Sequence, residues 1–265
     1  MSDYALSLSD AELARYRQMA AAARRDEAAQ WTAAGIVPGA RVADVGCGPG
    51  AVLVVMAEVV GASGSVTGVD AEPKAVAAAT AAIARAGLVN ATAQQGLAAD
   101  TGLDPSSYDA VVMRHVLAHN PRDEQRIVEH LATLVRPGGC VYLVDIEGTA
   151  LRWRPVDEDL ESLTAQYLAF HAARGADLQI GLRLGELLAG AGLDVVEYRG
   201  TYSIFQAPAG MRPPSWAARD AMVAEGAATA DDIARWDAAF TRIDRSATRP
   251  TLFAPMFTAI GRRPA

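Results

Sequence analysis

The chain has 265 residues, of which 51% are hydrophobic and 21% charged, and its formal net charge is −7. This size and composition predict one soluble globular domain with a good-sized core. No apolar run approaches the ~18–20 residues of a membrane span, and the first residues lack the basic and apolar regions of a signal peptide. An acidic chain without a basic stripe disfavours nucleic acid as a partner. We therefore expect neither a membrane nor a nucleic-acid partner.

Cysteines and acidic residues give no sign of a metal centre. The two cysteines, Cys47 and Cys140, are too few for a disulfide framework or a zinc site. We expect a protein of the reducing cytoplasm with no bound metal.

Residues 1–35 precede the first predicted strand. A capping box at Ser9 and Glu12, followed by apolar residues at helical spacing, predicts a helix or helix pair up to Trp31 that ends at Gly35. This segment is either an amphipathic helix packed on the sheet edge or a lid over a ligand. In the second case Tyr16 and Trp31 supply aromatic surfaces.

The decapeptide Arg41-Val-Ala-Asp-Val-Gly-Cys-Gly-Pro-Gly50 predicts a short strand and a glycine-rich turn, with a helix over residues 51–60. Glycines at 46, 48 and 50 let the backbone pass close to a ligand, and the helix behind offers free N–H groups. The residues around Asp44 and Cys47 therefore predict a cofactor site at the edge of a parallel sheet.

Two cofactors compete for this turn. Gly46-x-Gly48-x-x-Ala51 also satisfies the dinucleotide pattern G-x-G-x-x-G/A. The Asp44 carboxylate would repel a pyrophosphate, but it would attract a ligand with an amino or sulfonium group. These charges favour S-adenosylmethionine (SAM) over NAD, and a structural turn without a ligand stays a third alternative.

A second acidic residue, Asp70, follows the glycine turn at a spacing that is typical of nucleoside-binding sheets. The predicted strand over residues 65–70 ends at Asp70, 24 residues after Gly46, where a doubly wound sheet holds a carboxylate for ribose hydroxyls. Ala71 follows it and is assigned to the same site. Asp70 alternatively caps the helix that starts at Glu72 and Pro73. NAD enzymes share this feature, so it does not separate the two cofactors.

Polar residues also end the fourth and fifth predicted strands, residues 108–115 and 140–147. Arg114 and His115 point to the ligand edge, and His115 is our candidate general base because imidazole takes a proton near neutral pH. A buried histidine bonded to a backbone carbonyl is the competing interpretation, and His119 reads as structural. Asp145 and Glu147 either position an acceptor or pair with an arginine.

The glycine turn, Asp70 and the helix–Pro137-Gly-Gly–strand unit together resemble the class I SAM-dependent methyltransferases over residues 36–147. The resemblance implies a Rossmann-like doubly wound α/β sheet of seven strands in the order 3-2-1-4-5-7-6, with the last strand antiparallel. It also implies SAM as methyl donor, S-adenosylhomocysteine (SAH) as product, a lid, and contact of Arg114 with the methionine part of SAM. Members often carry Gly-Asp where this chain has Gly96-Leu97. The hydrogen bond to adenine must then come from elsewhere or be absent, and the backbone and side chain of Leu97 are the candidate contacts with the ring.

Beyond residue 147 the alternation of strands and helices breaks twice, at 148–180 and 206–250. We expect a single domain with an N-terminal lid (1–35), a SAM-binding core (36–147) and these two cap insertions. An aromatic, weakly polar cap suits a flat or apolar acceptor. The candidate acceptor-binding residues are Trp31, Trp153, Tyr167, Phe170 and His171, each of which is alternatively a core residue.

The resulting hypothesis is a SAM-dependent methyltransferase acting on a small aromatic or apolar acceptor of secondary metabolism. The alternatives are a macromolecular acceptor, a SAM-binding protein that does not methylate, and an NAD-dependent oxidoreductase. The sequence leaves open the acceptor, the methylated atom, the need for a base, and whether the protein is a monomer or a homodimer.

Overall fold

The computed structural model describes residues 10–265, so Ser9 of the predicted capping box lies outside the described residues. Its centre is one mixed sheet of eight strands. The strands are β1 (Arg41–Val45), β2 (Ser65–Asp70), β3 (Ala91–Gln95), β4 (Tyr108–Arg114), β5 (Val135–Ile146), β6 (Arg152–Arg154), β7 (Asp194–Gln206) and β8 (Thr251–Arg262).

The strand order confirms the predicted topology. The path runs β3-β2-β1-β4-β5-β8, with β1 to β5 parallel and β8 antiparallel to β5. Strand β7 pairs with the other edge of β8 along its whole length. The predicted sixth and seventh strands are β7 and β8, so the observed order is the predicted 3-2-1-4-5-7-6. The sequence did not predict the short β6. The pairing of β5 with β8 ends at Met256, and β6 then pairs with residues 251–253 of β8.

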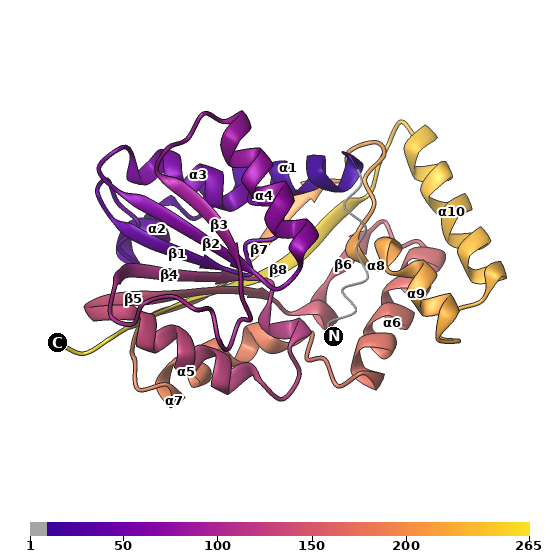
Figure 1. Ribbon diagram of the computed structural model, residues 1–265. Helices are drawn as coiled ribbons and strands as arrows, with labels where there is room; N and C mark the ends of the chain where they lie inside the picture. The colour runs from indigo at the N-terminus through magenta and orange to yellow at the C-terminus, as the bar shows by residue number, and fades with distance from the viewer. Residues whose placement is uncertain (1–9) are drawn as a thin grey trace.

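Helices cover both faces of the sheet (Figure 1). One face carries α1 (Asp10–Asp26), α2 (Ala28–Ala33), α3 (Ala51–Val60) and α4 (Pro73–Arg85); the other carries α5 (Glu124–Leu134) and α7 (Leu184–Gly190). Three short 3₁₀ turns, η1 (Leu117–His119), η2 (Gly148–Ala150) and η3 (Ile180–Arg183), join elements. None of the helices described is long and apolar enough to cross a membrane.

The remaining helices gather beyond one end of the sheet (Figure 1). They are α6 (Glu158–Ala173), α8 (Pro214–Ala217), α9 (Arg219–Ala224) and α10 (Ala230–Arg245). We call residues 148–180 and 206–250 the cap region. With β6 these helices enclose a hydrophobic cluster of their own, centred on Trp236 and Phe240, which are almost fully buried.

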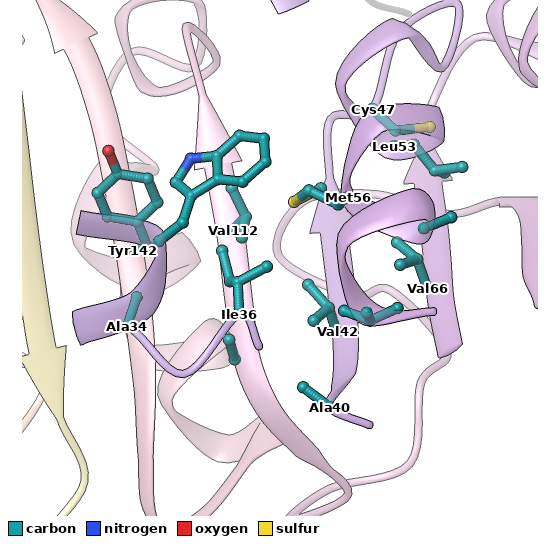
Figure 2. Packing of buried hydrophobic residues seen from close by; sticks show 14 of the residues in the cluster. Ala34, Ile36, Ala40, Val42, Cys47, Leu53, Met56, Val66, Val112 and Tyr142 are labelled. Atoms are coloured by element: carbon teal, nitrogen blue, oxygen red, sulfur yellow. The ribbon is translucent and has the colours of Figure 1, made fainter. Parts of the chain in front are cut away.

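Alternation along the strands explains how the sheet faces are filled. Figure 2 shows Val42, Val66 and Val112 of the strands meeting Leu53 and Met56 of α3. Helix α3 packs very close, because a Cβ added to Gly68 would lie 2.2 Å from Cδ1 of Leu53. This tight contact fixes where α3 begins, and hence the shape of the turn before it.

Candidate functional site

The turn between β1 and α3 is built from three glycines with left-handed backbones. A Cβ on Gly46 (φ 78°) would lie 2.2 Å from Val116, and one on Gly50 (φ 79°) would lie 2.9 Å from the backbone of Ala79. A Cβ on Gly48 (φ 54°) would meet only Cε1 of Tyr16, at 3.9 Å. Packing therefore accounts for the first and third glycines, whereas Gly48 faces a more open space next to Tyr16 of α1.

Asp70 ties this turn to the end of β2. Its carboxylate accepts hydrogen bonds from the backbone N–H of Gly48 (2.8 Å) and of Glu72 (3.0 Å). The second bond holds Glu72, the residue before α4. Asp70 therefore supports the start of this helix, as the capping alternative predicted, and also binds the glycine turn. A carboxylate has about four acceptor sites, so these two bonds leave capacity for ligand hydroxyls.

Asp44 lies deeper, with 3% of its surface exposed. Its Oδ2 is buried and has no hydrogen-bond partner among residues 10–265. Burial raises the pKa of Asp44 to about 7; Arg114 opposes that rise and Asp70 adds to it. An orphaned buried carboxylate favours a cation, and an amino group at the edge of the turn would satisfy it.

Arg114 is held by a residue that the sequence did not single out. Its guanidinium forms an ion pair with Glu27, at the junction of α1 and α2, and only 9% of the Arg114 side chain is exposed. Glu27 also accepts from the hydroxyl of Tyr142 (2.8 Å) and from Nε1 of Trp31 (3.4 Å). A lone glutamate near a helix end reads as solvated in a sequence, so no signal pointed to Glu27.

Cys47 can offer only its backbone to a ligand. Its side chain is buried in the core beside Leu53 (Figure 2), and a Cβ on Gly68 would lie 2.9 Å from its Sγ. Burial, with Asp44 and Asp70 nearby, raises the pKa of the Cys47 thiol. The thiol therefore stays neutral.

The adenine assignment needs a correction. The N–H of Leu97 donates to the carbonyl of Asp100 (3.1 Å), so the predicted backbone contact from Leu97 is already used. The Leu97 side chain is 62% exposed and remains a candidate surface for the ring. Gly96 is required by packing, since its Cβ would lie 2.7 Å from the carbonyl of Thr101. The carbonyl of Ala71 accepts from Nε2 of Gln95 (3.1 Å).

His115 follows β4 directly and adopts a left-handed backbone (φ 55°), which is rare for a non-glycine residue. Its Nδ1 lies 3.8 Å from Oδ1 of the buried Asp145 at the end of β5. Within the described chain neither Nε2 of His115 nor Oδ2 of Asp145 has a hydrogen-bond partner, although both are buried. The structure thus brings together an imidazole and a carboxylate whose outer atoms stay available.

Aromatic rings from α6 and η1 lie next to this pair. The ring of His171 is 4.4 Å from that of Tyr167 and 5.5 Å from that of His119. Burial, His119 and Arg174 lower the pKa of His171 to about 4, and burial raises the pKa of Tyr167 to about 12. Asp145 is among the charges that act on the pKa of both His119 and Tyr167, which places this aromatic group beside the His115–Asp145 pair.

Three of the predicted acceptor residues are core residues instead. Trp31 is 2% exposed in the main core, where α2 presses it against the sheet. Trp153 and Phe170 are each 4% exposed in the cluster of the cap region, although the Phe170 ring also contacts His171 (5.3 Å). These rings fill the inner faces of α2, β6 and α6, where burial of their apolar surface stabilises the packing.

Glu147 also has a structural role. Its carboxylate accepts hydrogen bonds from the backbone N–H (2.9 Å) and the hydroxyl of Thr149. Glu147 thereby caps the N-terminus of η2. Across the portion of the chain that the structure covers, no three acidic, histidine or cysteine residues are grouped closely enough to hold a metal ion.

These features all lie at the carboxyl ends of β1, β2, β4 and β5, where open α/β sheets bind their ligands. Three features meet at this edge: a buried aspartate whose Oδ2 has no partner in the described chain, a glycine turn facing Tyr16, and a second aspartate at the end of β2. Together with the strand order they define the class of Rossmann-like methyltransferase folds.

Comparisons with known proteins agree with this class. A family described as "Methyltransferase domain" matches residues 42–139. The chain is 34% identical over 154 residues to a ubiquinone biosynthesis O-methyltransferase of Pectobacterium carotovorum, covering 57% of this chain and 59% of that relative. It is 31% identical over 182 residues to an uncharacterized methyltransferase of Synechocystis, covering 66% of this chain and 78% of that relative. The match to the Pectobacterium enzyme thus spans less than two thirds of that enzyme's length.

A solved SAM-dependent methyltransferase from Aquifex aeolicus shares the fold, with a TM-score of 0.52, 18% identity, and coverage of 70% of this chain and 90% of that one. The chain belongs to the class I SAM-dependent methyltransferases, a family of enzymes whose methyl donor is SAM.

Proposed function

We propose that this protein transfers a methyl group from SAM to a hydroxyl group of a small aromatic molecule. The observation that carries the proposal is the His115–Asp145 pair. It has an unpartnered, buried Nε2 within the described chain. Val116, the residue after His115, packs against Gly46 of the turn, and Asp145 is close enough to His119 and Tyr167 to affect the pKa of both. A base that is held ready in this way is needed only when the acceptor must lose a proton.

The chain's own residues fit the cofactor. Asp44 would hold the amino group of SAM, Asp70 would accept from the ribose hydroxyls, and Leu97 would cover the adenine ring. Tyr16, close to Gly48, would lie over the bound molecule. When bound, SAM supplies a methyl group already activated by its sulfonium centre.

The protein then has to orient the acceptor, exclude water and take one proton. Nε2 of His115 accepts the acceptor's hydroxyl proton. Asp145, on the Nδ1 side at 3.8 Å, favours the tautomer with the proton on Nδ1 and stabilises the imidazolium that forms. The raised pKa of Tyr167 and the lowered pKa of His171 keep both rings uncharged near neutral pH, so they offer a flat neutral surface to an aromatic ring.

Relatives and charge support the same acceptor class. The similar Pectobacterium protein is named for O-methylation in ubiquinone biosynthesis. A net charge of −7 makes an RNA acceptor unfavourable. We extend the proposal to acceptors of secondary metabolism.

The test is transfer of an isotopically labelled methyl group from SAM to a panel of phenols, catechols, quinols, indoles, amines and carboxylates. Products are read by mass, and SAH affinity is measured in parallel by calorimetry. Asp70→Ala serves as the cofactor-site variant and should lower SAH affinity strongly.

The outcomes separate the alternatives. Methylated phenols or quinols support the proposal. Methylation of amines or carboxylates alone contradicts the hydroxyl assignment. SAH binding without any product favours a protein that binds SAM but does not methylate. Unchanged SAH affinity in Asp70→Ala would remove the cofactor assignment itself.

A further inference from the structure

A buried arginine and a buried aspartate lie near each other at the carboxyl ends of β4 and β1 without forming an ion pair. Asp44 is 3% exposed, and its Oδ2 has no hydrogen-bond partner among residues 10–265. Only 9% of the Arg114 side chain is exposed, and the carboxylate that it pairs with in the described chain belongs to Glu27. An unpaired charge in the interior is costly, so a separation of these two groups needs a cause.

The strand register places both side chains on one face of the sheet. Asp44 of β1 lies opposite Val112 of β4, and Val112 lies opposite Tyr142 of β5 (Figure 2). Side chains two positions apart on a strand share a face, so Arg114 lies on the same face as this row, one step closer to the carboxyl ends. Asp44 and Arg114 are thus diagonal neighbours on adjacent strands. Burial raises the pKa of Asp44, and the charge of Arg114 opposes that rise.

Glu27 holds the guanidinium on the side away from Asp44. It lies at the bend between α1 and α2, and besides Arg114 its carboxylate accepts from the hydroxyl of Tyr142 of β5 (2.8 Å) and from Nε1 of Trp31 (3.4 Å). Its backbone carbonyl accepts from the N–H of Trp31 (2.8 Å), whose buried ring anchors the bend in the core. Three donors therefore fix one oxygen of Glu27 on the β5 side of Arg114, while Asp44 lies on the β1 side.

We propose that Glu27 is a positioning residue for cofactor binding: it holds the guanidinium of Arg114 on the β5 side, so that the Asp44 carboxylate stays available for the amino group of SAM. This inference rests on the proposed binding of that amino group by Asp44. A chain that paired Arg114 with Asp44 would have to break this ion pair each time the cofactor bound. Pairing the arginine with Glu27 instead leaves the site for a cation already formed, which lowers the cost of binding.

Other ionisable groups also lie around Asp44. The Asp70 carboxylate at the end of β2 adds to the rise in the pKa of Asp44 that burial causes. Burial, with both aspartates nearby, raises the pKa of the Cys47 thiol in the turn, which stays neutral. Tyr16 of α1 lies beside the glycine turn. These groups supply no positive charge, so the position of Arg114 decides how far the charge of Asp44 is neutralised before the cofactor binds.

The first experiment measures the pKa of Asp44 in the cofactor-free protein from the NMR signal of its carboxyl carbon, which the spectrum of Asp44→Asn identifies. Glu27→Gln removes the charge that holds Arg114. The guanidinium should then move toward Asp44 and lower its pKa by about 1–3 pH units, as is usual for a carboxyl beside an arginine. An unchanged pKa of Asp44 in Glu27→Gln would overturn the proposal.

Arg114→Gln shows whether Glu27 acts through the arginine. This variant should raise the pKa of Asp44 above that of the wild type, because a nearby cation is lost. Adding Glu27→Gln to Arg114→Gln should change the pKa little, because Glu27 then has no guanidinium to hold. If Arg114→Gln leaves the pKa of Asp44 unchanged, or if Glu27→Gln lowers it equally with and without the arginine, the proposed mechanism is wrong.

The second experiment measures SAH affinity by calorimetry at pH 8. Glu27→Gln should weaken SAH binding by about tenfold for each pH unit by which its Asp44 pKa has fallen, because SAH must first break the new ion pair. Glu58→Gln is the matched control. It makes the same change in the exposed ion pair of Arg24 with Glu58 (2.6 Å), which joins α1 to α3, and it should bind SAH as the wild type does. Equal losses in the two variants would mean that looser packing of α1 is the cause and would overturn the proposal.

Asp44→Asn separates this inference from the cofactor assignment on which it rests. If Asp44→Asn binds SAH as tightly as the wild type at pH 8, the assignment of Asp44 fails, and the role of Glu27 fails with it. If Asp44→Asn loses SAH affinity but Glu27→Gln does not, Asp44 keeps its role and only the inference about Glu27 is wrong. Losses in both variants, with the expected change in the pKa of Asp44, support the proposal.

Discussion

On the proposed cofactor side of the site, a turn of the backbone and two carboxylates lie within residues 44–70. On the proposed acceptor side, single side chains come from β4, β5, η1 and α6, and the last of these belongs to the cap region. The first side depends on backbone shape, where an added Cβ meets atoms at 2.2 Å beside Gly46 and at 2.9 Å beside Gly50. The second depends on side chains that are partly exposed, such as Tyr167 and His171.

This difference separates what the two sides tolerate. A side chain added at Gly46 or Gly50 would displace the backbone, and one added at Gly48 would enter the space next to Tyr16. A change at an acceptor-side residue alters one contact and leaves the others. We therefore expect substitutions in the cofactor turn to abolish SAH binding. Substitutions on the acceptor side should change kcat or the acceptor KM by amounts that depend on the contact removed.

The largest effect is expected from Gly48→Val. The valine side chain would fill the space between Gly48 and Tyr16, so calorimetry should detect no SAH binding. Gly87→Val is the matched control. Gly87 also has a positive φ (66° against 54°) and open space around it, and it follows the end of α4 that is remote from Asp70, so the variant carries backbone strain away from the ligand. Equal SAH affinity in the two variants would show that the turn does not hold the cofactor.

A smaller loss is expected from His115→Ala. Removing a general base should lower kcat by about 10²–10⁴-fold while SAH affinity changes little. Asp145→Asn should lower kcat less, because His115 keeps its imidazole but loses the carboxylate on its Nδ1 side.

His130→Gln is the control for a histidine outside the site. His130 accepts from the backbone N–H of Thr101 (3.1 Å), so this variant can alter Tm but should retain kcat. A His115→Ala enzyme as active as the wild type would reduce His115 to a structural residue.

The next effect concerns pH. The pKa of Asp44 is raised to about 7 by burial, so the carboxylate is mostly protonated below pH 7 and cannot pair with an amino group. SAH affinity should therefore fall by about tenfold for each pH unit below 7. Asp44→Asn should bind SAH weakly at every pH and show no such slope.

The same group affects stability in the absence of cofactor. A carboxyl whose pKa is raised on folding stabilises the folded protein below its unfolded pKa, and that contribution is lost as pH rises through the folded pKa. Asp44→Asn should therefore raise Tm relative to the wild type at pH 8 but not at pH 4. A Tm difference independent of pH would contradict the raised pKa.

The smallest effect is expected from Tyr167→Phe. Losing one hydroxyl beside the acceptor should change the acceptor KM by about two- to tenfold, in line with one hydrogen bond. SAH affinity should be unchanged, because Tyr167 belongs to the acceptor side. An equal change in SAH affinity would mean that the two sides are not separate.

The sequence by itself determined the core topology and the cofactor turn. The strand over 65–70 and the helix over 51–60 have the bounds that were predicted, and the strand order and family are confirmed. These features depend on local chemistry: glycines with left-handed backbones, an aspartate at a strand end, and the alternation of strands with helices. Each is encoded within a few consecutive residues, so no knowledge of distant contacts was needed.

Only the tertiary structure decided which aromatic and charged side chains face the site. Trp31, Trp153 and Phe170 were predicted to contact the acceptor and are buried in cores, because aromatic residues at helical spacing look the same whether they fill a core or line a site. Glu27 pairs with Arg114, 87 residues away, and His115 meets Asp145 only because β4 and β5 lie side by side. Contacts between distant segments depend on how whole elements pack, and the sequence around each residue does not encode them.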